Sequence, residues 1–291
     1  MWAYVNGAFV PDRDAVVSVH DRGFRYGDGV FDTLRVYDGR PFLLDEHVGR
    51  LVASSKTLGI GGLPPENALS ALIREVISRN GFSNALIRTT VSRGVSDGWE
   101  PDPAARPSLV VVGRAFSGYP DHLYRDGASI VVTTIRMPAS DLDPVLKSLN
   151  RLPQVQAKRE AMTRGADEAV LCTDTGLVAE GCVSNVFCVD AGRIITPPAS
   201  VGLLPGITRG VVIDLARREG LACDEAPFGP EDLQGADEVF LTSTGMEVLP
   251  VTRVDGRQIG GGRPGPIASA LRRRYHIRIR ESGSERSLPS P

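Results

Sequence analysis

Apolar and polar residues follow one another in short blocks along the first third of the chain, and the blocks predict hairpins and helices. An Asn-Gly or Asp-Gly pair between two apolar runs is a strong signal for a tight β-turn. Apolar residues that recur every three or four positions instead predict helices with one buried face. We therefore expect hairpin turns at Asn6-Gly7 and Asp38-Gly39, helices after Asp45 as N-cap and after Pro64-Pro65, and strands at 85–92 and 108–112.

The rest of the chain shows the same mixture, without the regular strand–helix–strand alternation of a parallel sheet. A polar, aperiodic stretch at 119–127 indicates a connection between two domains. Beyond it we expect strands at 130–135, 169–172, 186–189 and 239–242, and helices at 149–164, 207–218 and 267–275, the first closed by Gly165. The pattern predicts an α+β protein with an N-terminal domain at 1–118, a connection at 119–127, a C-terminal domain at 128–280 and a disordered polar tail at 281–291.

Composition is that of an ordinary globular protein. The 291 residues are 42% hydrophobic and 23% charged, with a formal net charge of −2, so nothing favours nucleic acid or a membrane surface as a partner. The N-terminus lacks a basic and apolar leader pattern, and no apolar run is long enough to span a bilayer. The four cysteines lack C-x-x-C spacing and the four histidines lack i, i+4 pairs. We expect reduced thiols, no metal site and a cytoplasmic location.

Seven short segments carry more specific information. In chain order they are Asp21 to Gly23, Tyr26 to Phe31, Glu46 to Leu51, Lys147 to Asn150, Glu180 to Phe187, Leu204 to Arg209, and Thr242 to Glu247 with Pro250-Val251. Their order and spacing resemble the class IV aminotransferases, the fold-type IV pyridoxal-phosphate enzymes, from about Val5 to Arg274. That family includes branched-chain and D-amino-acid aminotransferases, (R)-selective amine transaminases and aminodeoxychorismate lyase.

The resemblance implies an architecture, a cofactor and a partner. The architecture is a small N-terminal α+β domain and a larger C-terminal pseudo-barrel domain that binds pyridoxal 5′-phosphate. The partner is a second copy of the chain, in a homodimer in which a loop of the neighbouring subunit closes each site. Trp99 and the loop around it are candidates for that loop, although an exposed loop tryptophan explains the residue equally well.

The resemblance matches Lys147 to the lysine that carries the cofactor as a Schiff base. On composition alone a lysine is more often a solvated surface residue. Only Lys56 and Lys158 compete with it, and both lie on expected helix faces. Glu180 matches the carboxylate that keeps the ring nitrogen of the cofactor protonated, and would otherwise be interpreted as a strand-end carboxylate. An amine and an acid are what such a site requires.

The remaining candidates would hold the phosphate and the substrate. Ile207 and Thr208 follow Gly206 at the start of an expected helix, whose free N–H groups and positive dipole end suit an anion. By resemblance, the other cofactor-binding residues are Arg50, Ser184, Asn185, Leu204 and Thr244, with Leu204 on one face of the ring. The residues of the substrate pocket are, by resemblance, Phe31, Thr33, Trp99, Gly245 and Met246.

The segments do not agree on one member of the family. Lys147 to Asn150 resembles the D-amino-acid enzymes, but Phe31 stands where those usually have Tyr, and their Arg-x-His clamp is missing after Arg93. Asp32 to Arg35 departs from the Glu-Gly-Ile-Arg of the branched-chain enzymes. Thr33 after Phe31, and Leu149 to Leu152, resemble aminodeoxychorismate lyase, which releases pyruvate to give 4-aminobenzoate.

We therefore expect an aminotransferase that moves an amino group between a small amino acid or primary amine and a 2-oxo acid. The lyase is the alternative. A cofactor-binding scaffold without turnover would predict loss of Lys147 or Glu180, and both residues are present. The substrate, its stereochemistry and the amino acceptor depend on the shape of the pocket, and the sequence leaves them open.

Overall fold

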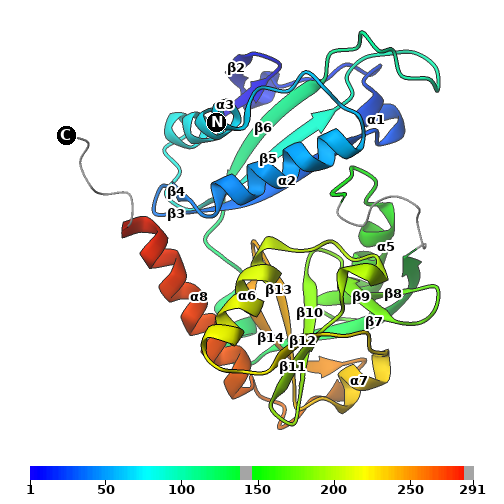
Figure 1. Ribbon diagram of the computed structural model, residues 1–291, viewed down its shortest axis with the longest axis vertical. Helices are drawn as coiled ribbons and strands as arrows, with labels where there is room; N and C mark the ends of the chain where they lie inside the picture. The colour runs from blue at the N-terminus through cyan, green and yellow to red at the C-terminus, as the bar shows by residue number, and fades with distance from the viewer. Residues whose placement is uncertain (138–145, 285–291) are drawn as a thin grey trace. The chain divides into compact units, whose positions relative to one another are not determined.

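The chain divides into two units, each built around its own sheet (Figure 1), in the computed structural model, which describes residues 1–137 and 146–284. The first unit comprises Met1–Ser117 and Leu146–Asn150, and the second comprises Gly118–Val145 and Arg151–Pro291. The α+β class expected from the sequence is confirmed, because the strands of the first unit are all antiparallel and its two long helices lie between strands that are not joined by a parallel crossover.

The first unit is a six-stranded antiparallel sheet with strand order β2-β1-β6-β5-β3-β4. Its strands are β1 (Trp2–Val5), β2 (Ala8–Pro11), β3 (Gly29–Tyr37), β4 (Arg40–Pro41), β5 (Ala85–Ser92) and β6 (Ser108–Ala115). The helices are the 3-10 turn η1 (Asp12–Asp14), α1 (Arg22–Tyr26), α2 (Leu44–Thr57) and α3 (Glu66–Arg79). Helices α2 and α3 lie on one face of the sheet (Figure 1).

Both predicted hairpin turns are confirmed. Asn6 and Gly7 have φ of 48° and 101°, and Asp38 and Gly39 have φ of 47° and 76°. Positive φ at both central residues is the requirement of a type I′ turn, which Asn or Asp followed by Gly meets at little cost. In the neighbouring strands the side chains alternate between the two faces, so Val30, Leu34 and Val36 of β3 enter the core beneath α2 and α3.

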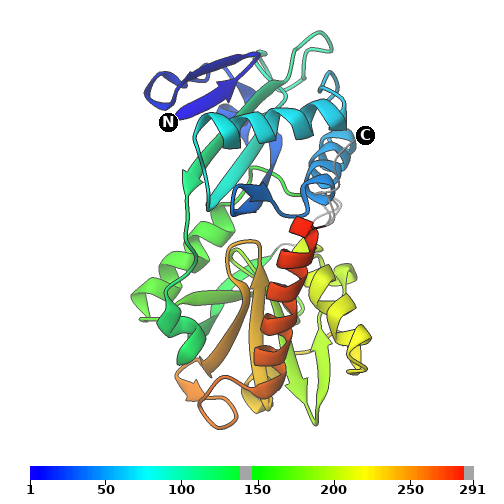
Figure 2. The same cartoon turned by 90° about the vertical axis from the view of Figure 1, so that its left-hand side faces the viewer.

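The second unit contains a mixed sheet with strand order β12-β11-β10-β13-β14-β7-β8-β9, and β15 pairs with β14. Its strands are β7 (Ala128–Met137), β8 (Glu168–Thr173), β9 (Val178–Gly181), β10 (Asn185–Asp190), β11 (Arg193–Thr196), β12 (Cys223–Glu225), β13 (Glu238–Ser243), β14 (Glu247–Val254) and β15 (Arg257–Gln258). The helices are α4 (Asp121–Arg125), α5 (Leu152–Thr163), η2 (Ala199–Val201), α6 (Ile207–Arg218), α7 (Pro230–Gly235) and α8 (Pro266–Ser284). Helix α8 lies along β13 and β14 (Figure 2).

Several sequence-based boundaries are wrong, each for a local reason. Asp45 lies in the first turn of α2 and does not cap it, because the N-cap is Leu43 in a left-handed conformation with φ of 53°. The stretch 119–127, which was expected to connect the two domains, contains α4. Helix α8 continues to Ser284, so residues 281–284 of the expected tail are helical, whereas 285–291 lie outside the described residues. The loop expected at 138–144 also lies outside them.

Candidate active site

Lys147 lies on an extended segment that is bound to β3. The backbone N–H of Phe31 donates to the Lys147 carbonyl at 3.0 Å, and that of Leu149 donates to the Gly29 carbonyl at 2.9 Å. Val30 and Ser148 form an antiparallel bridge between the same two segments. These bonds explain two differences from the sequence-based prediction: residues 146–150 belong to the first unit, and the helix expected from Leu149 begins only at Leu152.

A glycine lets the lysine segment approach β3 this closely. A Cβ on Gly29 would collide with the Val91 carbonyl oxygen and would lie 2.8 Å from Cδ1 of Leu149. The Leu149 side chain thus fills the space that a larger residue at position 29 would need. The segment is therefore fixed by the packing of Leu149 and by the backbone hydrogen bonds that Lys147 and Leu149 make with β3.

The ring of Phe31 lies beside two cationic groups of the first unit. Nζ of Lys147 is 4.9 Å from the ring centroid, and the guanidinium carbon of Arg88 is 3.6 Å from it. Thr33 pairs directly with Arg88 across β3 and β5, so the side chains of Phe31, Thr33 and Arg88 share the sheet face that α2 and α3 do not cover. The structure thus places Nζ of Lys147 beside Phe31, a predicted pocket residue, and puts Thr33 on the same face of β3 as Phe31.

Arg88 was not among the residues singled out from the sequence. An arginine in a strand of alternating burial is usually a solvated residue on the outer face. The sequence did contain one indication. Residues of β5 alternate between buried and half-buried positions from Ala85 onward, so Arg88 lies on the same face as the half-buried Thr90. Only the pairing register with β3 shows that this face also carries Phe31.

Arg50 is held on the opposite, helix-covered side of β3 by Asp32. Nε and Nη2 of Arg50 donate to the two carboxylate oxygens of Asp32 at 2.7 and 3.0 Å, and Nδ1 of His47 lies 2.7 Å from Oδ1. Burial would raise the pKa of the Asp32 carboxyl, but His47 and Arg50 outweigh burial and hold that pKa well below its usual range. The orientation of Arg50 is thereby fixed, and its role toward a phosphate stays a prediction.

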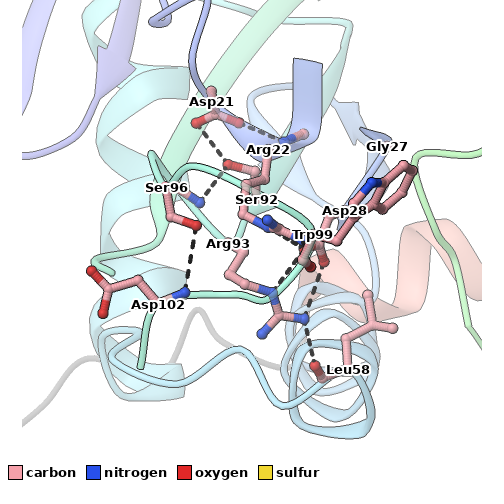
Figure 3. A network of polar contacts seen from close by, with 12 residues as sticks. Asp21, Arg22, Gly27, Asp28, Leu58, Ser92, Arg93, Ser96, Trp99 and Asp102 are labelled. Carbon is pink, nitrogen blue, oxygen red and sulfur yellow. Dashed lines mark hydrogen bonds and ion pairs between the residues drawn. The ribbon is translucent and has the colours of Figure 1, made fainter. Parts of the chain in front are cut away.

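Trp99 lies on a loop that a polar network holds against α1 (Figure 3). The buried guanidinium of Arg22 donates to Oδ2 of Asp28 at 2.8 Å and to the carbonyls of Gly98 and Trp99 at 2.8 and 3.1 Å. Arg93 donates to both carboxylate oxygens of Asp28, at 2.8 and 3.1 Å. The Trp99 ring lies 5.0 Å from that of Tyr26, and Trp99 is 82% exposed. A loop held by buried charges therefore presents an exposed aromatic side chain.

In the second unit, Glu180 and Asn185 hold one segment from two sides. The Leu204 backbone N–H donates to Oε2 of Glu180 at 3.0 Å, and Nδ2 of Asn185 donates to the Leu204 carbonyl at 2.8 Å. Both side chains are buried, and Glu180 lies in β9 next to the start of β10, where Asn185 begins the strand. A buried carboxylate that accepts one backbone N–H can also accept a hydrogen bond from a protonated ring nitrogen.

Beyond this segment, α6 begins at Ile207 with Gly206 as N-cap and no side-chain cap. The first N–H groups of a helix have no partner within the helix, so they are available to an anion. A Cβ on Gly206 would collide with Oδ1 of Asn185. Only glycine therefore lets the backbone at position 206 lie this close to the Asn185 side chain. The segment therefore places open N–H donors beside the two residues that grip Leu204.

Two buried hydroxyls of the second unit support an anion at this place. Oγ of Ser184 and Oγ1 of Thr242 are buried and have no hydrogen-bond partner among the described residues. Asn185 and Thr242 are direct partners across β10 and β13, so these residues lie at the same end of the sheet. Unpartnered buried hydroxyls are costly unless a ligand or water satisfies them. The donor set fits a phosphate group, with Thr208 buried nearby at the start of α6.

The turn from Ser243 to Glu247 joins β13 to β14 and contains three predicted residues. Thr244 and Gly245 are half-buried, whereas Met246 is 1% exposed and packs in the core of the second unit. Its side chain belongs to the same core cluster as Leu123 and Leu249, and the expected place of Met246 in the substrate pocket stays a prediction.

The described part of the chain offers neither a metal centre nor a membrane span. Residues 1–137 and 146–284 contain no group of three or more His, Cys, Asp or Glu side chains that could hold a metal ion. Within the same residues, no helix is both long and apolar enough to cross a bilayer. The first unit supplies a lysine amine, and the second unit supplies a buried carboxylate and a set of anion donors. These are the groups that an enzyme for a phosphorylated carbonyl cofactor requires.

Comparison with known proteins identifies the family. The family model described as Amino-transferase class IV matches residues 29–254. A putative branched-chain-amino-acid aminotransferase of Methanocaldococcus jannaschii is 41% identical over 277 residues, covering 94% of this chain and 95% of its own. A D-alanine aminotransferase of Bacillus licheniformis is 36% identical over 263 residues, covering 90% of this chain and 91% of its own. The chain belongs to the class IV aminotransferase family, and the aminotransferase expected from the sequence is confirmed.

Solved structures agree with this assignment. The branched-chain amino acid aminotransferase of Escherichia coli matches with a TM-score of 0.91 and 30% identity, covering 95% of this chain and 93% of its own. A branched-chain amino acid aminotransferase of T.th., solved with pyridoxamine 5′-phosphate, matches with a TM-score of 0.89 and 35% identity, covering 94% and 92%. A 4-amino-4-deoxychorismate lyase of Pseudomonas aeruginosa matches with a TM-score of 0.84 and 27% identity, covering 94% and 98%. The expected fold is confirmed.

Proposed function

We propose that this aminotransferase uses pyridoxal 5′-phosphate, held on Lys147, to move an amino group between a small amino acid and a 2-oxo acid. Bound cofactor would supply an electron sink for the electron pair left on the α-carbon of the donor. Glu180 would keep the ring nitrogen protonated, and the donors near Ser184, Asn185, Ile207, Thr208 and Thr244 would hold the phosphate, with Arg50. Leu204 would cover one face of the ring, and Lys147 would take the proton from the α-carbon of the donor.

The arrangement around Phe31 carries the preference for an amino acid over a simple amine. Lys147 Nζ and the Arg88 guanidinium both lie within 5 Å of the centre of one ring. In an α-amino acid the amine and the carboxylate are attached to the same carbon, so a donor that reacts beside Lys147 carries its carboxylate toward Arg88. A guanidinium is the side chain best suited to a carboxylate. A primary amine without a carboxylate gains nothing from Arg88.

A half-reaction with the purified protein tests this proposal. Donors are added without acceptor, and loss of the visible absorbance of the cofactor reports amino transfer. Arg88→Leu should raise the apparent dissociation constant of amino acids about 10- to 100-fold, since a charge-assisted hydrogen bond is lost, and leave that of a carboxylate-free amine unchanged. Arg114→Leu, on the neighbouring strand β6, is the matched control. Equal effects of Arg88→Leu on both donor types would refute the carboxylate role.

One observation keeps the lyase as a second candidate. Thr33 lies directly across from Arg88, on the face that carries Phe31. A hydroxyl at that place could assist proton transfer during loss of pyruvate. The two functions separate cleanly: a lyase releases pyruvate and 4-aminobenzoate from aminodeoxychorismate, while its visible absorbance persists with every amino donor. An aminotransferase loses that absorbance with at least one donor.

We further propose that the partner is a second copy of this chain, which docks on an apolar patch of the first unit. We define this proposed patch by six exposed apolar side chains: Val16, Val17, Val19, Phe24, Val95 and Trp99. They come from two segments joined by a backbone bridge between Asp21 and Val95. Exposed apolar residues that are concentrated on neighbouring segments are typical of an interface.

Analytical ultracentrifugation tests this proposal. The parent protein should sediment as a dimer, Val17→Asp should dissociate the dimer, and Val155→Asp on α5 should leave it intact. A monomeric parent protein would exclude the proposal.

The cytoplasm is the proposed location. Cys172, Cys182, Cys188 and Cys223 are all free and buried. Free thiols without disulfide partners are typical of proteins that fold in a reducing compartment.

A further inference from the structure

Glu247 adopts a backbone conformation that an ordinary side chain avoids. Its φ is 57°, in the left-handed region where glycine is at ease and a glutamate is strained. The position closes the turn after Thr244 and Gly245, where the hairpin of β13 and β14 begins to pair again at Ser243 and Glu247. A glutamate at such a position indicates that its side chain is needed.

The side chain of Glu247 binds helix α8. Its Oε2 lies 2.6 Å from Nε2 of His276, and the carboxylate is 12% exposed. One helical turn earlier on the same face of α8, the Arg272 guanidinium lies 3.9 Å from the centroid of the Tyr124 ring. The Tyr124 hydroxyl in turn donates to the Met246 carbonyl at 3.0 Å. Helix α8 thus supports the turn at two adjacent residues, once directly and once through Tyr124.

The same helix is fixed at the other end of the hairpin. The carboxylate of Glu238, the first residue of β13, accepts from the backbone N–H groups of Ile267 and Ala268 at 3.0 and 2.9 Å. Between Ile267 and His276 the helix advances about 13 Å, which is comparable with the roughly 17 Å that β13 advances between its ends. Two glutamates nine residues apart along the hairpin therefore grip α8 at points nine residues apart along the helix.

We propose that α8 is a strut, and that His276 is a positioning residue that fixes the Ser243–Glu247 turn through Glu247. This inference rests on the proposed function, in which Thr244 helps to hold the cofactor phosphate; Gly245 and Met246, next to it in the turn, are the candidate pocket residues. His276 touches neither. It holds the left-handed conformation of Glu247, which sets the direction of the peptide groups that precede it. Without this contact the turn relaxes, and its donors lose their alignment.

Three variants on α8 test the strut. His276→Ala removes the contact, whereas His276→Gln keeps an N–H donor near the place of Nε2. Arg274→Ala is the matched control, because Arg274 pairs with Glu219 at 2.8 Å on the surface, away from the turn. The readouts are the dissociation constant of pyridoxal phosphate, amide hydrogen exchange of the peptide that spans the turn, the apparent KM of an amino donor, and Tm.

His276→Ala should raise the cofactor dissociation constant and the donor KM about fivefold or more, a size typical of couplings carried by a neighbouring residue. Amide exchange in the turn should accelerate, and His276→Gln should restore all three values to near those of the parent. The control should match the parent. Parent-like binding and exchange in His276→Ala, or equal defects in the Ala and Gln variants, would overturn the strut.

Failure of the proposed function can be told apart from failure of the role proposed for His276. If the parent protein binds the cofactor but transfers no amino group, the function is refuted while cofactor affinity and exchange still decide the strut. If the parent binds no cofactor, amide exchange in His276→Ala and His276→Gln decides the strut alone. A lower Tm of His276→Ala without faster exchange in the turn would mean that His276 only stabilises α8, and would also overturn the proposal.

Discussion

The guanidinium of Arg50 holds both oxygens of the Asp32 carboxylate, at 2.7 and 3.0 Å, while His47 contacts one of them at 2.7 Å. Asp32 is 4% exposed, so its charge is balanced inside the protein. It is also the residue between Phe31 and Thr33, whose side chains point to the other face of β3. The ion pair therefore ties the strand that carries two candidate pocket residues to helix α2.

Replacing Asp32 should be costly. Asp32→Asn removes one member of a buried ion pair and leaves Arg50 without its counter-charge, which typically costs about 3–5 kcal/mol in the free energy of unfolding. Urea unfolding of the cofactor-free protein measures this. Glu75→Gln is the control, since Glu75 pairs with Arg79 at an exposed site on α3 and should contribute less than about 1 kcal/mol. Equal losses in both variants would show that Asp32 is not paired as described.

The same pair predicts a dependence on pH. The pKa of Asp32 is lowered in the folded protein, so the folded state binds this proton less readily than the unfolded state does. Its stabilising contribution is complete above the unfolded pKa, at roughly pH 4, and is lost as the pH falls toward the folded value. The stability difference between the parent protein and Asp32→Asn should therefore be constant from pH 5 to 7, as approximate bounds, and shrink below about pH 4. A difference that grows on acidification would contradict the pairing.

Lys147 should be dispensable for folding and required for activity. Its backbone is bonded to β3, so Lys147→Ala should leave Tm nearly unchanged. Borohydride reduction of the parent protein with pyridoxal phosphate should attach the cofactor to the peptide that contains Lys147, as seen by mass spectrometry. The variant should show no attachment and no turnover. Lys56→Ala, at an exposed position of α2, should behave like the parent, and attachment at Lys56 or Lys158 would refute the assignment.

Two glycines of one helix separate a steric requirement from helix propensity. Gly206→Ala places a Cβ against Oδ1 of Asn185, so it should displace the start of α6 and weaken cofactor binding by tenfold or more, as an order-of-magnitude estimate. Gly210→Ala meets no atom within 4 Å and lies on the exposed side of α6. It should raise stability by about 1 kcal/mol and leave binding unchanged. Cofactor titration and thermal unfolding test both, and similar binding in the two variants would argue against the phosphate site.

The thiols should be unreactive in the native state. Burial raises the pKa of Cys182 and Cys188 to about 12, with the neighbouring Glu168 carboxylate adding to the effect at Cys182. A disulfide reagent at about pH 8 should therefore label almost no thiol until the protein unfolds, when four thiols react. Because these pKa values are raised on folding, the contribution of the neutral thiols to stability is complete below the unfolded pKa of about 8.5 and decreases above it. Rapid labelling of folded protein at neutral pH would contradict this burial.

Local pattern was sufficient where one physical signal dominated. Helix α6 begins at Ile207 and ends at Arg218, as the sequence predicts. Gly206 is its N-cap, and apolar residues follow at helical spacing. The two hairpin turns were also predicted from a single local signal. Few residues other than Asn, Asp and Gly adopt positive φ at low cost. The motifs likewise identified the family, because members of one family keep the same functional side chains at the same places along a common fold.

Local pattern failed where two signals conflicted. The last helix was predicted to end at Tyr275. From His276 to Arg280 polar and apolar residues alternate, a pattern that is more typical of a strand than of a helix. The structure continues α8 to Ser284, because contacts with β13, β14 and α6 stabilise the helix. Strand β14 was not predicted, and it contains Pro250, a residue that is unusual inside a sheet because it cannot donate a ladder hydrogen bond. Pro250 nevertheless pairs with Phe240 in the middle of the sheet.

The sequence by itself determined the family, the candidate lysine and carboxylate, and most elements of both units, since these depend on residue type and short-range spacing. The tertiary structure alone decided which side chains meet. It paired Arg88 with Thr33 across two strands, placed the Met246 side chain in the core, and joined Glu247 to His276. Each of these facts depends on strand register or on helix packing, which brings together residues that lie far apart in the chain and leave no local pattern.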